Sequence, residues 1–111
     1  MNKTSGTPEQ MSLPAQAKQL LIRFQTAAQQ LRRGEDLAGI ESLLLAMDEL
    51  ERWAASAQTA QLPQIDLSRL LSLVRAMNRS VQNQDFSGMA DLLEDGFCPL
   101  IDAWLRGWED R

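Results

Sequence analysis

The sequence predicts an all-α fold, an antiparallel bundle of four helices, and three observations support this prediction. Apolar residues recur at intervals of three and four in four separate stretches, which is the period of one helix face. Strand signals are absent, because β-branched residues are few and no stretch alternates with a period of two. The prevailing charge changes sign from each stretch to the next. A chain of 111 residues with 44% apolar and 23% charged residues has the size and composition of one globular domain.

The first two helices are predicted over residues 14–33 and 35–58. Arginines in the last turn of the first helix, followed by Gly34, are helix-stop signals, and Asp36 is the expected cap of the second helix. The apolar faces predicted to pack in the core consist of Ala17, Leu20, Leu21, Phe24, Ala27, Ala28 and Leu31, and of Leu37, Ile40, Leu43, Leu44, Met47, Leu50 and Ala54.

The other two helices are predicted over residues 66–83 and 86–108, with Asp66 and Asp85 as their caps. Their periodic apolar positions predict a third and a fourth core-facing stripe. These stripes consist of Leu67, Leu70, Leu71, Val74, Met77 and Val81, and of Phe86, Met89, Ala90, Leu93, Phe97, Leu100, Ile101, Trp104 and Trp108.

The two halves of the chain resemble each other. Residues 36–40 match residues 85–89 at a displacement of 49, and a pair of apolar residues follows each segment after two further positions. Two interpretations stay open: a duplicated helical hairpin, or chance similarity between two helix starts. The alternation of charge favours the hairpin arrangement, because each helix of an up-down-up-down bundle then lies beside neighbours of opposite sign.

The domain organisation is predicted to be simple. Residues 1–12 are polar and without a period, so we expect a disordered N-terminal arm followed by a single helical domain over residues 13–111. The sequence shows neither an apolar signal segment after Met1 nor a stretch of about twenty apolar residues. Neither export nor a membrane span is therefore expected, and the expected location is the cytoplasm.

The composition excludes several classes of function. The chain has no histidine and one cysteine, Cys98, so it holds no Ser-His-Asp or Cys-His triad, no phosphotransfer histidine and no di-iron Glu-x-x-His motif. One cysteine without histidine cannot complete a zinc or iron–sulfur site or an internal disulfide. We therefore expect no enzyme activity, cofactor or metal. The net charge of −4 argues against nucleic-acid binding.

The strongest candidate for a partner-binding site is the C-terminal half of the last helix. Pro99 removes a backbone donor and crowds the carbonyl of Asp95, so a kink and an unpaired carbonyl are expected there. A broad apolar stripe with tryptophans, which are common in binding hot spots, surrounds this proline. The alternative is that the stripe is broad because this helix is central to the core. The candidate docking residues are Phe97, Pro99, Ile101, Trp104 and Trp108.

A second candidate patch consists of Leu45 and Trp53, which lie off the apolar stripe of their helix. These two residues are either incidental edge positions or a contact in a dimer or with a partner. Acidic residues on the last helix, including Asp91, are interpreted as a solvated face, with docking of a basic partner as the alternative. Cys98 is expected to be inert, because neighbouring carboxylates raise a thiol pKa.

Part of the last helix resembles a known family. Asp91-Leu92-Leu93-Glu94, followed by Pro99-Leu100, is similar to a C-terminal Asp-x-Leu-Glu-Tyr-Glu-x-x-Pro-Leu pattern in small all-helical bacterial proteins associated with motility and cell-surface genes. The resemblance covers about ten residues, and Asp95-Gly96 replaces the Tyr-Glu pair. It implies a bacterial helical bundle with a flagellum-associated helper role, and it implies no catalytic residues.

Two functional hypotheses follow from the sequence. The first is a non-catalytic binding module, an adaptor or chaperone-like protein that holds an amphipathic partner helix in a groove between its own helices. The second is a self-associating, homodimeric regulatory protein that uses Leu45 and Trp53. An enzyme ranks third, because the sequence places no cluster of chemical groups on a core-facing side.

Overall fold

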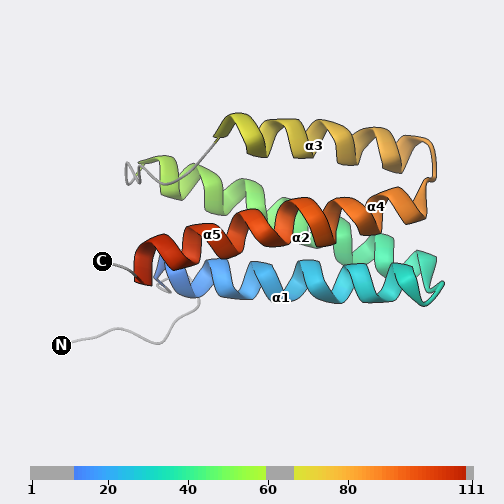
Figure 1. Ribbon diagram of the computed structural model, residues 1–111, viewed down its shortest axis with the longest axis horizontal. Helices are drawn as coiled ribbons and strands as arrows, with labels where there is room; N and C mark the ends of the chain where they lie inside the picture. Colours follow the sequence, from blue (N-terminus) through green and yellow to red (C-terminus); the bar gives the residue numbers. More distant parts are fainter. Residues whose placement is uncertain (1–11, 60–66, 110–111) are drawn as a thin grey trace.

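In a computed structural model, the described residues are 12–59 and 67–109, and all regular structure in these two segments is helical (Figure 1). This confirms the predicted all-α class. The chain reverses direction at the turn after α1 and at the turn after α3 (Figure 1). The elements are α1 (Leu13–Arg32), α2 (Asp36–Thr59), α3 (Leu67–Gln82), α4 (Phe86–Leu92), the π-helical segment η2 (Leu93–Phe97) and α5 (Cys98–Glu109).

The start of α1 is defined by a side-chain cap. The hydroxyl oxygen of Ser12 accepts a hydrogen bond from the N–H of Ala15 at 3.2 Å, which satisfies one of the free donors at the helix start. Ser12 therefore caps the helix that begins at the predicted start of the helical domain. The rest of the predicted arm at 1–12 lies outside the described residues, as does the predicted cap Asp66.

The two helical hairpins use the same turn. In each turn one residue has a positive φ, 80° at Gly34 and 55° at Gln84, and the backbone closes a Schellman motif around it. The hydrogen bonds run from the N–H groups of Gly34, Glu35, Gln84 and Asp85 to the carbonyls of Leu31, Gln30, Val81 and Ser80, at 3.2, 2.9, 3.1 and 2.8 Å.

These equivalent bonds are displaced by 50 residues, so the displacement of 49 predicted from residue types is wrong by one position. Asp85 precedes α4 and its carboxylate accepts from the N–H of Gly88 at 2.9 Å, as predicted for a cap. The equivalent position before α2 is occupied by Glu35, whereas Asp36 is already the first helical residue. Asp36 is therefore not the cap, because the sequence match aligned it with an aspartate one position off the structural equivalent.

Gln84→Gly should stabilise the second turn. A left-handed conformation costs a residue with a Cβ about 1 kcal/mol, and glycine avoids that cost, as Gly34 does in the first turn. We expect the free energy of unfolding, measured with urea, to rise by about 0.5–1 kcal/mol. The matched control is Asn83→Gly, at a position without positive φ, which should lower stability. An equal effect of the two substitutions would contradict the turn geometry.

Helix α1 is the centre of the packing. It contacts α2 on one side and α4, η2 and α5 on the other, while α3 packs against α4 and η2. Two aromatic pairs lie inside: the rings of Phe24 and Phe97 stack with centroids 5.1 Å apart, and those of Trp53 and Trp104 with centroids 4.9 Å apart. Burying these rings provides a large share of the hydrophobic stabilisation.

The backbones of α2 and α3 do not pack closely against each other, in contrast to the pairs above. Three leucines predicted to face the core are exposed as a result: Leu37 by 74%, Leu44 by 55% and Leu71 by 54%. Their assignment to the buried face was wrong, because the seam that would cover them is open.

The last helix contains the disturbance expected near Pro99, in a different form. The turn before the proline is π-helical, and the N–H of Cys98 donates to the carbonyl of Leu93, five residues back. The wider turn adapts the helix to the donor that Pro99 lacks. Gly96 lies in this turn against α3: a Cβ added there would be 2.5 Å from Cδ2 of Leu73.

Candidate functional site

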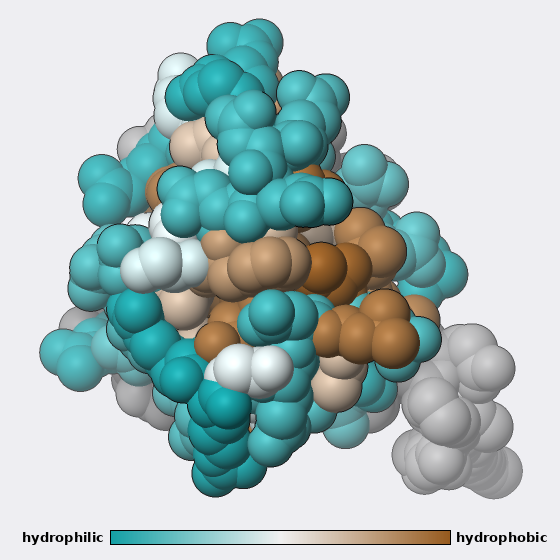
Figure 2. Space-filling model, turned by 90° about the vertical axis from the view of Figure 1, so that its right-hand side faces the viewer, coloured by the Kyte–Doolittle hydropathy of each residue, from teal (hydrophilic) through white to brown (hydrophobic). Residues whose placement is uncertain are grey.

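An apolar hollow lies between α2 and α3. This α2–α3 groove has a volume of about 420 Å³, and all of its lining side chains except Glu51 are apolar. Figure 2 faces the end that carries the two turns, where apolar surface gathers at the centre and to one side and is bordered by hydrophilic surface. The lining of the groove lies further from these turns, in the second half of α2 and the first half of α3. The groove is lined by Met47, Leu50, Glu51, Ala54, Ala55, Leu70, Leu71 and Val74.

The exposed leucines of α2 lie on the side of that helix that faces the groove. Leu37 and Leu44 are seven residues apart, so they lie on the same side of α2, and Met47 of the groove lining follows Leu44 by three positions. On α3, Leu71 and Val74 are likewise three positions apart. The result is an apolar strip that runs along the seam and exceeds the scattered exposure of single leucines that is normal for a protein surface.

Charges of opposite sign border this groove. The residues of α2 include five acids and one arginine, and those of α3 include three arginines and no acid. Glu51 lines the groove, and Asp48 forms an ion pair with Arg52 at 3.1 Å. Arg75 follows Leu71 by one helical turn on the other wall. The groove thus has an acid, Glu51, on its α2 side and a base, Arg75, beside its lining on α3.

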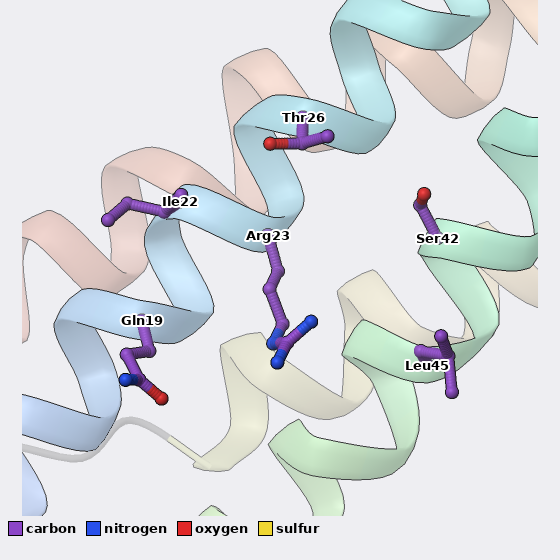
Figure 3. Close-up of a pocket in the computed structure, with 6 residues that line it drawn as sticks. All are labelled: Gln19, Ile22, Arg23, Thr26, Ser42 and Leu45. Atoms are coloured by element: carbon purple, nitrogen blue, oxygen red, sulfur yellow. The ribbon is translucent and has the colours of Figure 1, made fainter.

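A second hollow, of about 370 Å³, lies between α1 and α2 on another side (Figure 3). Ile22 and Leu45 are each 60% exposed at its edges, so the predicted exposure of Leu45 agrees with the structure. Arg23 extends between the two helices (Figure 3) and pairs with Glu49 at 2.8 Å. With Gln19, Thr26 and Ser42 also in its lining, this hollow is more polar than the α2–α3 groove.

Trp53 is not part of an exposed patch with Leu45. Its side chain is buried, stacks on Trp104, and donates a hydrogen bond from Nε1 to the carbonyl of Leu13 at 2.9 Å. The prediction from helical angles was wrong because α5 extends the core across this side of α2. The exposed neighbour of Leu45 is Ile22, which the sequence interpretation did not single out.

The predicted docking surface on the last helix is also corrected. Phe97, Ile101 and Trp104 are buried in the core, so they cannot contact a partner in this conformation. The alternative explanation holds instead: the apolar stripe is broad because the last helix packs against both α1 and α3. Pro99 is exposed, and the side chain of Trp108 lies outside the described residues.

The acidic surface of α4 and η2 is partly neutralised. Arg32, at the end of α1, donates from Nη2 to Asp91 at 2.6 Å and to Glu94 at 2.8 Å. The hydrogen-bonded carboxylates of Glu94 and Asp91 raise the pKa of the arginine further above its ordinary value, so the guanidinium stays charged. Ion pairs therefore connect α1 to the last helix in this region, and it is not a purely solvated acidic face.

Cys98 is predicted to be unreactive at neutral pH. Partial burial, with a smaller contribution from Glu94, raises the pKa of its thiol to about 11. The rate of alkylation by iodoacetamide should therefore rise with pH, with a midpoint at about pH 11 in the folded protein and at about pH 8.5 in urea. The thiolate is disfavoured by folding, so this site's contribution to stability is complete below the unfolded pKa and is lost as the pH rises through about 11.

The control for this prediction is Cys98→Ala. The free energy of unfolding of this variant should not show the decrease between about pH 9 and pH 11 that the thiol causes in the parent protein. A native alkylation midpoint near pH 8.5 would show that the thiol is not held in a partly desolvated site.

Comparison with known proteins places the chain in a family. The model of a domain of unknown function, DUF8042, matches residues 16–107. The chain belongs to the DUF8042 family. The matched region includes both hairpins and every residue that lines the α2–α3 groove. Comparisons with curated proteins and with solved structures find no match.

Two further features complete the description of the DUF8042 domain. Within residues 12–59 and 67–109, the structure has no helix with the length and apolar character needed to cross a bilayer. In the same segments, no three His, Cys, Asp or Glu residues are grouped in a way that could hold a metal ion.

Proposed function

We propose that this chain is a non-catalytic protein-binding domain, an adaptor or chaperone-like module that captures an amphipathic helix in the α2–α3 groove. The observation that carries the proposal is the exposure of Leu37, Leu44 and Leu71 along one seam, although each belongs to the periodic apolar stripe of its helix. A partner that covered this seam would bury them.

The proposed architecture is an antiparallel four-helix bundle that is incomplete on one side. A helix laid between α2 and α3 would contact both walls, in the same way that amphipathic helices occupy the grooves of other helical proteins. Such a partner needs apolar residues at positions i, i+3 or i+4, and i+7 to reach Met47, Leu71 and Val74.

The charges of the two walls favour a particular partner helix. A basic edge would lie beside α2, where Glu51 borders the groove, and an acidic or neutral edge beside the arginines of α3. Because these charges are exposed, association should weaken as the salt concentration rises.

The remaining parts of the proposal come from the sequence. The similarity of the last helix to motility-associated proteins makes a segment of the motility apparatus the proposed partner, and the cytoplasm is the proposed location. The proposal assigns no catalytic residue, cofactor or metal.

The test is site-specific photo-crosslinking in the native cell. A photoreactive phenylalanine analogue is introduced at Leu71 in one variant and at Ile22 in a matched control, since both side chains are exposed to a similar extent on different surfaces. We expect position 71, and not position 22, to crosslink to a segment that mass spectrometry identifies and whose sequence has the apolar period of an amphipathic helix.

The proposal then requires the identified segment, made as a peptide, to bind the purified chain. Titration calorimetry should show binding that Leu71→Glu weakens about tenfold or more and that Ile22→Glu leaves unchanged. Equal crosslinking from both positions, or peptide binding that is insensitive to Leu71→Glu, would overturn the proposal.

A further inference from the structure

We infer that, when no partner helix is present, the α2–α3 groove is covered by a second copy of this chain, in a symmetric dimer whose two-fold axis runs parallel to the groove. The inference concerns the same groove as the proposed function and depends on its being a binding surface. It identifies what covers the groove when no partner helix is bound.

The first argument is self-complementary charge. A two-fold interface brings the same patch of both copies together, so a patch of a single sign repels itself. The groove avoids this problem because its α2 side carries the acid Glu51, while Arg75 follows the lining residue Val74 on its α3 side.

The direction of the axis follows from these charges. An axis that lies in the interface parallel to the groove places α2 of each copy opposite α3 of the other, with the acidic helix against the basic helix. An axis that lies in the interface across the groove places α2 opposite α2, with acid against acid. Electrostatic complementarity therefore selects the parallel axis.

The parallel axis also determines which residues meet. Rotation about it leaves every residue at the same height along the groove. Glu51 lines the groove together with Leu70, Leu71 and Val74, so it lies at the level of that part of α3. Arg75 is the next residue after Val74. In the dimer Glu51 of one copy thus lies at the level of Arg75 of the other, and the two pairs are equivalent by symmetry.

The face between the two helices has the size of a small, reversible interface. Helix α3 has 16 residues, which corresponds to about 24 Å, and two neighbouring helices are about 20 Å wide together. The face that both helices share is therefore of the order of 500 Å² on each copy, below the roughly 800 Å² that each partner contributes to a standard interface and in the range of weaker, reversible ones. Three of the five large apolar side chains exposed among the described residues, Leu37, Leu44 and Leu71, lie on this side.

The first experiment is sedimentation equilibrium of the full chain in low salt. We expect a reversible dimer of twice 12.5 kDa. Leu71→Glu should raise the dissociation constant about tenfold or more, whereas Ile22→Glu, with a similarly exposed side chain outside the groove, should leave it unchanged. A chain that stays monomeric into the high micromolar range overturns the inference, and so does a dimer that Ile22→Glu dissociates and Leu71→Glu does not.

The second experiment tests the pairing of α2 with α3 of the other copy. Glu51→Arg and Arg75→Glu should each weaken the homodimer about tenfold, because two attractive contacts become repulsive. A mixture of the two single variants should form a heterodimer, since one chain then has bases at both positions and the other has acids at both. An ion pair within one chain cannot produce this rescue. Failure of the mixture to associate more tightly than either variant alone overturns the proposed axis.

These outcomes separate the inference from the proposed function. If the chain is monomeric but position 71 still crosslinks to an amphipathic segment, the proposed function is supported and the dimer is refuted. If the chain forms a dimer with the expected charge dependence, but shows no site-selective crosslink to another protein, the dimer is supported and the proposed function is refuted.

Discussion

Replacing Phe97 by alanine is expected to lower the free energy of unfolding by about 3–5 kcal/mol. The side chain is completely buried and its ring stacks on Phe24 with an interplanar angle of 18°. Truncation removes the buried apolar surface and leaves a cavity between α1 and the last helix, where the ring of Phe24 loses its stacking partner. Because small domains have a total stability of about 5–15 kcal/mol, the variant should be close to unfolding at 37 °C.

Urea denaturation followed by circular dichroism measures this effect. Leu45→Ala is the control, since its side chain is exposed and the change should be within about 0.5 kcal/mol. A loss below about 1 kcal/mol for Phe97→Ala would show that the ring is not packed between the helices.

Trp53→Ala is expected to cost a similar amount, about 3–5 kcal/mol. The indole is buried against Trp104, and its Nε1 donates to the carbonyl of Leu13 at 2.9 Å, so the substitution removes apolar contact and also leaves a backbone acceptor without this donor. Trp53→Phe separates these contributions because it keeps most of the ring and loses the hydrogen bond.

The matched comparison is Trp104→Phe. The Nε1 atom of Trp104 is buried and has no hydrogen-bond partner among the described residues, so its replacement removes no such bond. Trp53→Phe should therefore destabilise the protein by about 1 kcal/mol more than Trp104→Phe. Equal effects of the two phenylalanine substitutions would contradict the asymmetric environment of the two indoles.

The spacing of apolar residues predicted the bounds of the helices well, and predicted less well which helices pack against each other. The four helical stretches lie within one or two residues of α1, α2, α3 and the α4–η2–α5 helix, because the spacing of apolar residues reflects one chain segment alone. The distance between two helices depends on all the side chains between them. For this reason Leu44 and Leu71, placed in the core by period, lie beside an open seam, and Trp53, placed off the core, lies within it.

The candidate site was misplaced by the same limitation. A broad apolar stripe on the last helix is required for packing on α1 and α3, and it equally resembles a binding surface when its neighbours are unknown. The charge pattern did not single out the α2–α3 groove either, because the sign alternates between every two successive helices. The shift of one residue in the repeat arose because matching residue types aligned Asp36 with Asp85, whereas the backbone bonds align Glu35 with Asp85.

The loose attachment of α3 has a consequence for how the groove behaves in time. Among the described core residues, only Leu70 and Met77 come from this helix, so it opens at a smaller free-energy cost than α1. Its amides should lose protection against hydrogen exchange while those of α1 are still closed. One wall of the groove therefore has its own local unfolding equilibrium, and any occupant that binds only the closed form slows exchange in α3 in proportion to its occupancy. Exchange rates of α3 thus report on what fills the groove, even when the occupant itself is invisible to the measurement.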